Sequence, residues 1–254
     1  MISSMKLLLV PFLVAWLSAC ISTTSNPAPE SDPDKAADVR AELAAGYMQR
    51  GQLEVARTEL QRALDIDPQH SRANHMMALL QLRLRDPKSA EYYFKRAISS
   101  DKENSIAMHD YGVFLCQSGR VDEAMKQFQS AMNNPLYQRA ALTNLRAGEC
   151  YMVKSSDRRT AEKYLRAALE SSPGLPAALY LMAEISFLDK KYLSARGYIE
   201  RYFATGRDSA KSLLLAARIE HSLGDKKMAG EYAEKLRTKY PNSKEAKQLP
   251  NKKS

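Results

Sequence analysis

The side chains of this chain best suited to covalent or metal chemistry are three cysteines and four histidines. No two histidines stand four residues apart, the spacing that lets two imidazoles on one helix share a metal ion. The chain also contains no Gly-x-Ser-x-Gly motif, no glycine-rich phosphate loop and no His-Glu-x-x-His. We therefore expect a protein that is not an enzyme and that needs neither a metal ion nor a cofactor. The four histidines are His70, His75, His109 and His221.

Cys20 ends an N-terminal segment that has the composition of an export signal. The first six residues carry one positive charge, and residues 7–17 form an apolar run that Pro11 interrupts. This run is too short to cross a membrane, which takes about 20 apolar residues, so we interpret residues 1–19 as a cleaved signal peptide. Residues 17–20 read Leu-Ser-Ala-Cys, which resembles the bacterial lipobox. Lipidation of Cys20 is the prediction, and an ordinary secretory signal is the alternative.

The residues after Cys20 predict where the protein resides. Position 21 is an isoleucine; an aspartate there commonly retains Gram-negative lipoproteins at the inner membrane, so we expect a lipid anchor on the periplasmic face of the outer membrane. More than one acyl chain makes such an anchor stable. Residues 20–36 are rich in Ser, Thr, Pro and Asp, a composition that cannot form a core and predicts a flexible tether.

Beyond the tether, six alanines recur at near-constant intervals of about 34 residues, with one longer interval before the fourth. Four and seven residues after each alanine come residues that are mostly apolar or small, which places all three on one face of a helix. Gly51, Gly119 and Gly224 fall five residues before their alanines, where a turn between two helices needs a positive φ. Asp86-Pro87 is typical of a helix N-cap with proline at the first helical position. The alanines are Ala56, Ala90, Ala124, Ala161, Ala195 and Ala229.

This pattern resembles the tetratricopeptide (TPR) repeat, a helix–turn–helix unit of about 34 residues. It predicts an all-α fold: a superhelical solenoid of six repeats over residues 37–241, followed by a basic capping tail at 242–254. In the fourth repeat Gly148 stands thirteen residues before its alanine instead of twelve, which indicates an extra residue in the turn near Lys154. The predicted repeats are 37–70, 71–104, 105–138, 141–175, 176–209 and 210–241.

Charge and the remaining cysteines add two expectations. The full chain has 38 basic and 29 acidic residues, and loss of Lys6 with the signal peptide lowers the net charge from +9 to +8. The basic residues are spread over exposed helix faces, and the protein is exported, so we expect neither nucleic acid nor a small-molecule substrate as partner. Cys116 and Cys150 stand at different phases of neighbouring first helices, whose separation of about 8–10 Å favours two buried thiols; a disulfide is the alternative that an oxidising periplasm allows.

In TPR arrays the concave wall is lined by five positions of each first helix. Many of these positions are apolar in this chain, which is typical of a surface that binds another polypeptide. Repeats 1 and 2 follow the membrane tether, so they are the preferred site. In the first three repeats the predicted groove consists of Ala41, Ala45, Met48, Gln49, His75, Leu79, Leu82, Arg83, His109 and Val113.

Four segments sharpen the resemblance to one family of lipoproteins. Residues 46–51 (GYMQRG), 63–68 (ALDIDP), 110–115 (DYGVFL) and 210–215 (AKSLLL), together with the lipobox, resemble the type IV pilus biogenesis family PilF/PilW. The resemblance implies a pilotin, a monomer that binds the pilus secretin and helps it reach the outer membrane and multimerise. Two alternatives remain at this point: a general periplasmic TPR scaffold, for example for cell-wall synthesis enzymes, and a soluble adaptor without a lipid.

Overall fold

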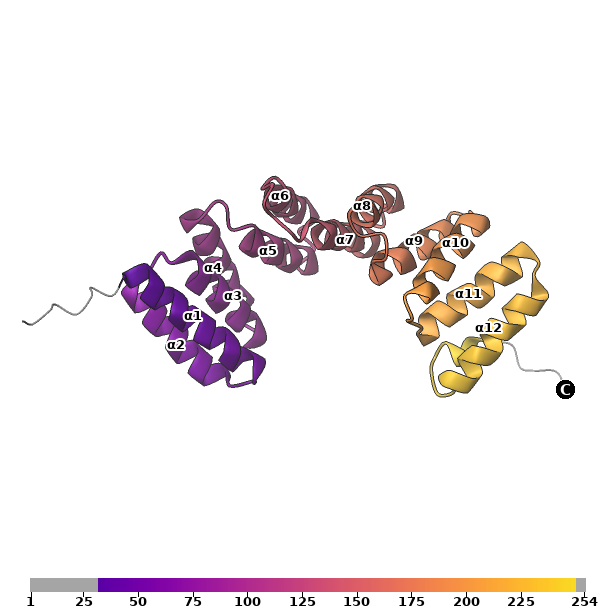
Figure 1. Ribbon diagram of the computed structural model, residues 1–254, viewed down its shortest axis with the longest axis horizontal. Helices are drawn as coiled ribbons and strands as arrows, with labels where there is room; N and C mark the ends of the chain where they lie inside the picture. Colours follow the sequence, from indigo (N-terminus) through magenta and orange to yellow (C-terminus); the bar gives the residue numbers. More distant parts are fainter. Residues whose placement is uncertain (1–31, 250–254) are drawn as a thin grey trace, which may run out of the picture. The chain divides into compact units, whose positions relative to one another are not determined.

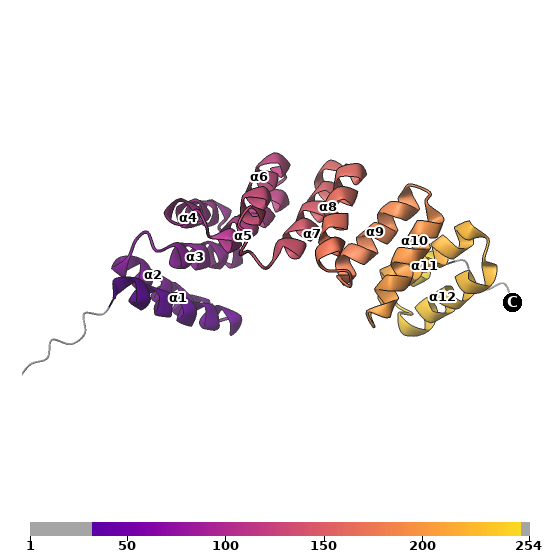
Figure 2. The same ribbon diagram turned by 45° about the horizontal axis from the view of Figure 1, so that its top comes forward.

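The computed structural model describes residues 32–249, and in this part of the chain all regular structure is helical. Twelve α-helices form six antiparallel pairs, which follow one another in sequence order from indigo to yellow (Figures 1 and 2). Cys20, the predicted signal peptide and most of the predicted tether lie outside the described residues. The pairs are α1 (Pro33–Gln49) with α2 (Leu53–Ile66), α3 (Ser71–Arg83) with α4 (Pro87–Ser100), α5 (Ser105–Gln117) with α6 (Val121–Met132), α7 (Ala140–Cys150) with α8 (Arg158–Ser171), α9 (Pro176–Leu188) with α10 (Tyr192–Ala204), and α11 (Ala210–Leu223) with α12 (Lys226–Lys239).

Small side chains at the crossing point hold each pair together. The first five repeat alanines are fully buried, and so are the residues four positions later, such as Leu60, Phe94 and Ile199. In the third pair Gly112 crosses directly over Phe128, so close that a Cβ at Gly112 would lie 2.6 Å from the ring. The predicted alanine–apolar stripe is therefore the interface between the two helices of a pair. Only Ala229, in the last pair, is half-buried.

Each pair also packs on the next one along the chain. The second helix of each pair contacts the first helix of the following pair, and α1, α5, α7 and α9 also touch the next first helix. Contacts between neighbouring units are the source of stability in repeat proteins. None of the helices within residues 32–249 combines the length and the apolar character that a membrane span requires.

Side-chain caps and left-handed residues separate the helices. Asp86 accepts a hydrogen bond from the Ser89 amide (3.0 Å), with Pro87 at the first helical position, as predicted. The turn glycines Gly51, Gly119 and Gly224 all have positive φ. The second and fifth pairs have Arg85 and Lys190 at the equivalent positions, with φ of 62° and 60°.

One boundary differs from the prediction: helix α1 begins at Pro33, so residues 33–36 are helical and not part of a tether. The irregularity predicted near Lys154 is present, because helix α7 continues into a single π-helical turn, Tyr151–Ser155, before α8 begins. The capping tail contains a 3₁₀ turn, Ala246–Gln248.

Candidate partner-binding surface

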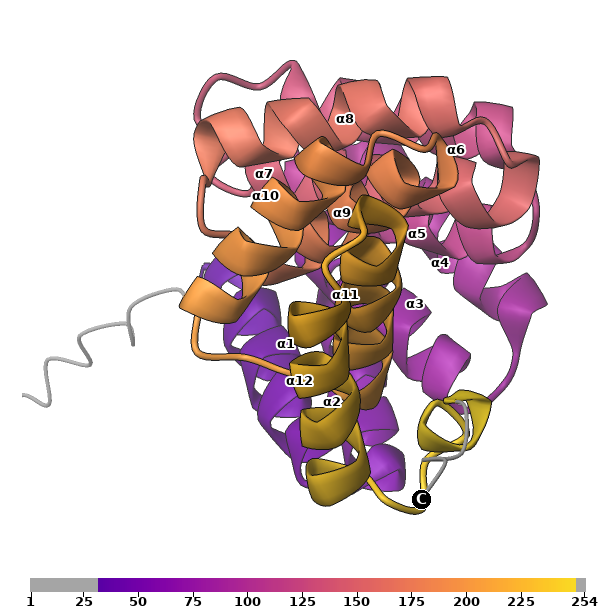
Figure 3. The ribbon, with the colours of Figure 1, turned by 90° about the vertical axis from the view of Figure 1, so that its right-hand side faces the viewer.

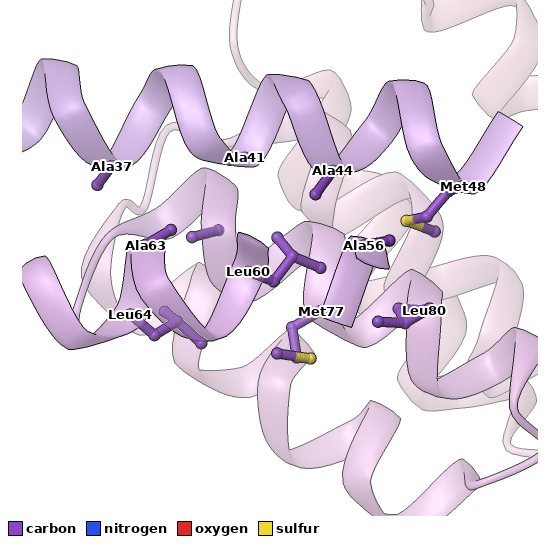
Figure 4. Close-up of a cluster of buried hydrophobic side chains, with 11 residues drawn as sticks. Ala37, Ala41, Ala44, Met48, Ala56, Leu60, Ala63, Leu64, Met77 and Leu80 are labelled. Atoms are coloured by element: carbon purple, nitrogen blue, oxygen red, sulfur yellow. The ribbon is translucent and has the colours of Figure 1, made fainter. Parts of the chain in front are cut away.

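We define the first-helix surface as the solvent-facing side of α1, α3, α5, α7, α9 and α11. Four of the ten predicted groove residues are buried. Ala41 and Met48 belong to the core between α1 and α2, together with Ala56, Leu60 and Ala63 (Figure 4). His75 and His109 are 3% and 5% exposed. For Ala41, Met48 and His75 the prediction was wrong, because their positions face a neighbouring helix and not the solvent. His109 is buried too, but it lines a hollow that opens beside the Cys116–Cys150 disulfide.

The other six predicted residues reach solvent to different degrees. Gln49 and Arg83 are exposed, and Arg83 donates a hydrogen bond to the backbone carbonyl of Met48, which connects α3 to the end of α1. The remaining four are half-buried, and Leu79 and Leu82 also pack against the clusters beneath them. Their outer atoms are available to a partner. These four residues are Ala45, Leu79, Leu82 and Val113.

His75 and His109 connect successive repeats. His75 Nε2 lies 2.8 Å from Asp110 Oδ2 on α5, and His109 Nδ1 lies 2.7 Å from Thr143 Oγ1 on α7. Burial lowers the pKa of His109, so this imidazole is neutral in the folded protein at neutral pH. Their chemistry is therefore inter-repeat hydrogen bonding.

Cys116 and Cys150 form a disulfide between α5 and α7, with Cα atoms 5.9 Å apart. The expectation of two free thiols was wrong. The separation of about 8–10 Å is measured between helix axes, whereas each Cα atom lies about 2.3 Å from its axis. Two Cα atoms that face each other across the interface therefore lie well within the range of a disulfide.

A hollow of about 500 Å³ opens beside this disulfide, and we call it the central hollow. Val113, Leu142 and the two cysteines give it apolar walls, and Arg139, Arg146 and Glu149 give it charged ones. Arg146 Nη1 pairs with Glu149 Oε2 at 2.7 Å. Apolar walls with a charged rim suit an apolar segment of a polypeptide. Within residues 32–249 no group of three His, Cys, Asp or Glu residues is arranged to hold a metal ion.

The central hollow contains residues that the sequence prediction missed. Arg139 and Val153 line it and are exposed, but neither belongs to the predicted groove. They were missed because the predicted groove was limited to the first three repeats. Arg139 is the N-cap residue of α7, and Val153 lies in the π-helical turn that follows α7 in the fourth repeat.

Repeat-family models match almost the whole described chain. Models described as tetratricopeptide repeats match residues 37–70, 75–146, 152–208 and 211–243. This chain belongs to the tetratricopeptide-repeat family. The family match agrees with the six helix pairs, so the predicted all-α TPR fold is confirmed.

The TPR chain is also homologous to pilus proteins along nearly its whole length. It is 29% identical to the type IV pilus assembly protein PilF of Pseudomonas aeruginosa, over 92% of this chain and 94% of that protein. The solved structure of Pseudomonas aeruginosa PilF matches with a TM-score of 0.76 and 29% identity, covering 85% of this chain and 96% of that one. The structure of PilW, described as a widely conserved type IV pilus biogenesis factor, matches with a TM-score of 0.74 and 28% identity, covering 83% and 96%. The predicted relationship to PilF/PilW is confirmed.

More distant TPR structures share the fold alone. YrrB, described as a TPR protein with an unusual peptide-binding site, is 16% identical with a TM-score of 0.60, over 75% of this chain and 98% of that one. Its ligand is therefore no guide to the ligand of the present chain.

Proposed function

We propose that this TPR protein is an outer-membrane lipoprotein of type IV pilus assembly that binds the pilus secretin and promotes its localisation and multimerisation. The observation that carries the proposal is the alignment with PilF, which covers 92% of this chain and 94% of the relative. Sharing a TPR fold would not carry it, because one fold serves many functions. A match over 92% of the chain leaves out too few residues to omit any helix pair entirely.

The proposed mechanism has two parts. An acyl group on Cys20 would place the protein, and whatever it holds, at the outer membrane. The first-helix surface would hold secretin subunits there and raise their local concentration before the channel closes. The central hollow, between the third and fourth pairs, replaces repeats 1 and 2 as the preferred contact, because it combines apolar walls with exposed cationic side chains such as Arg139.

Gene replacement tests the proposed role. Cells in which the gene is deleted should lose secretin multimers from the outer membrane, and the wild-type gene should restore them. Cys20→Ala should leave the TPR domain folded, because the described domain begins twelve residues later, yet leave the secretin misplaced. If deletion leaves secretin multimers intact and alters cell-wall synthesis instead, the pilotin role is wrong and the general scaffold is favoured.

Two exposed residues of the central hollow test the proposed contact. Val153 is 74% exposed, so Val153→Asp should not disturb the core, and Arg139→Glu reverses an exposed charge. Together they should reduce recovery of the secretin with the purified protein at least about tenfold, a change that the loss of one or two interface contacts can produce. Leu193→Asp is the matched control, since Leu193 is 73% exposed on α10, a second helix. Unchanged recovery with the hollow variant would exclude the central hollow as the contact.

A further inference from the structure

Helix α1 carries an apolar face that no earlier repeat covers within residues 32–249. Val39 is 66% exposed and Leu43 is 44% exposed. The residues at the same positions of the next repeat are Ala73 and Met77, which are 0% and 2% exposed because α3 packs on the first pair. In the second repeat, residues at these positions pack the first helix onto the preceding pair. In α1 the residues at the same positions are apolar but exposed.

The other end of the row has a matching hollow. It has a volume of about 660 Å³ and lies between α11 and α12, with Ala217, Ala229, Gly230 and Ala233 in its walls; we call it the end hollow. Figure 3 looks onto α12 and the C-terminal turn, where the row of described helix pairs ends. The C-terminal segment forms one further wall, and Arg218 donates a hydrogen bond of 2.8 Å to Gln248 in it.

The fifth pair shows which residues pack onto the equivalent surface elsewhere in this structure. The counterparts of Ala217, Ala229 and Ala233 in that repeat are Ala183, Ala195 and Ile199, all 0% exposed. They belong to one buried cluster with Leu215, Ala216 and Ile219 of α11, the first helix that packs on α10. The end hollow is therefore the surface onto which a further first helix would pack, in continuity with an interface that this structure already contains.

The sizes of the side chains at the two ends are complementary. If α1 docked onto the end hollow as α11 docks onto the fifth pair, Leu43 would take the place of Ala216. Ala233 stands where the fifth pair has Ile199, so the smaller wall leaves room for the larger incoming side chain, as close packing requires. The rim carries Arg218 and an ion pair between Arg237 and Glu234, while α1 contributes the exposed carboxylate of Glu42, so Arg218 and Glu42 supply opposite charges at the two ends.

We propose that α1 of one copy of this protein docks into the end hollow of a second copy, so that the row of repeats continues from one chain to the next. The proposal does not rest on the proposed function, and it replaces the monomer expected from the sequence. The contact is heterologous, since two different surfaces meet, so it extends without closing. One helix covers less than the roughly 1,200–2,000 Å² buried in stable complexes, which makes the association weak and reversible.

Sedimentation velocity of the chain from residue 21 onward, from micromolar to millimolar concentration, tests the association. The wild type should sediment faster as concentration rises. Leu43→Glu blocks α1, and Gly230→Arg fills the end hollow, where a Cβ would meet nothing within 4 Å. Each variant should raise the dissociation constant at least about tenfold. Gly197→Arg is the matched control, because Gly197 is also helical, exposed and surrounded by open space, and it should associate like the wild type.

Mixing the two blocked variants tests the orientation. The α1 of Gly230→Arg and the end hollow of Leu43→Glu are both intact, so the mixture should form dimers and stop there, while each variant alone stays monomeric. Val39→Glu serves as a second α1 variant if Leu43→Glu melts below the wild type. A wild type that stays monomeric at every concentration overturns the proposal. So does a wild type that associates while the mixture forms no dimer, or while Leu43→Glu associates equally well.

Discussion

Cys116 on α5 and Cys150 on α7 are joined by a disulfide that links the third and fourth helix pairs, with Cα atoms 5.9 Å apart. The bond lies at the junction where the interval between successive repeat alanines is longest, from Ala124 to Ala161. It also forms part of the wall of the central hollow. An irregular junction between two repeats is thus covalently closed beside the candidate contact site.

Replacing both cysteines by serine should destabilise the protein, because the open chain has more conformations when unfolded. For a sequence separation of 34 the chain-entropy model gives about 3–4 kcal/mol in the free energy of unfolding. Denaturant unfolding of the oxidised wild type and of the double variant measures the difference. Reductant should lower the midpoint of the wild type and leave the variant unchanged. Equal midpoints for the two oxidised proteins would contradict the prediction.

Glu91, on α4, should make the contact between the second and third pairs sensitive to acid. Its carboxylate pairs with Lys95 and Arg120 at 2.8 Å and accepts a hydrogen bond from Tyr111 at 3.1 Å. Lys95 first, then Arg120 and Tyr111, lower the pKa of Glu91 from 4.5 to about 2, although burial opposes the shift. Because the folded state holds the proton less tightly than the unfolded state, stability is complete above about pH 4.5 and is lost as the pH falls toward about 2.

The variant Glu91→Gln tests this expectation. It should lower the free energy of unfolding at pH 7 by about 1–2 kcal/mol and flatten the loss of stability between pH 4.5 and about 2. Glu170→Gln, at an exposed position on α8, is the control and should behave like the wild type. If Glu91→Gln keeps the full acid dependence, another carboxylate is responsible for it.

Gly112 and Gly148 should not tolerate a methyl group. A Cβ at Gly112 would lie 2.6 Å from the Phe128 ring, and a Cβ at Gly148 would lie 2.7 Å from Leu165 Cγ, each with a backbone carbonyl within 3.3 Å. Gly112→Ala and Gly148→Ala should each cost about 1–3 kcal/mol, the usual range for overpacking. Gly197→Ala has open space around it and should instead stabilise its helix by up to about 1 kcal/mol. Thermal or denaturant unfolding of the three variants measures these changes in stability. A Gly112→Ala variant that is more stable than the wild type would contradict the packing described here.

Replacing Arg85 or Lys190 by glycine should increase the stability of the protein. Both occupy the left-handed turn position that glycine fills in three other repeats, and this conformation costs a residue with a Cβ roughly 1–2 kcal/mol. Arg85→Gly and Lys190→Gly remove that cost but raise the conformational entropy of the unfolded chain. We therefore expect each to raise the free energy of unfolding by about 0.5–1 kcal/mol. Gly51→Arg should show the reverse sign. Melting temperatures measure both, and a loss of stability on Arg85→Gly would show that its side chain matters more than its backbone.

Much of the fold was predictable because one packing rule recurs. An alanine at the crossing point and an apolar residue four positions later are needed in nearly every pair, so their spacing revealed the helices, the turns and the number of repeats. The start of α1 was not predictable in the same way. Residues 33–36 lie before the first repeat position, so the repeat spacing makes no prediction for them.

The candidate site was less predictable, because exposure depends on the neighbouring repeat. Ala41 and His75 stand at groove positions by count, yet α2 covers one and Asp110 of the following repeat engages the other. In neither case does the type of residue predict that the side chain is buried. The disulfide was missed for a geometric reason, since a spacing between helix axes does not fix the distance between two facing Cα atoms.

Recovery of the secretin with this protein from solubilised outer membranes tests the central claim most directly. A tagged wild-type protein should bring down the pilus secretin, and the Val153→Asp, Arg139→Glu double variant should recover at least about tenfold less at equal abundance. Leu193→Asp should recover as much as the wild type. Failure of the wild-type protein to recover any secretin from membranes that contain both proteins would contradict the account.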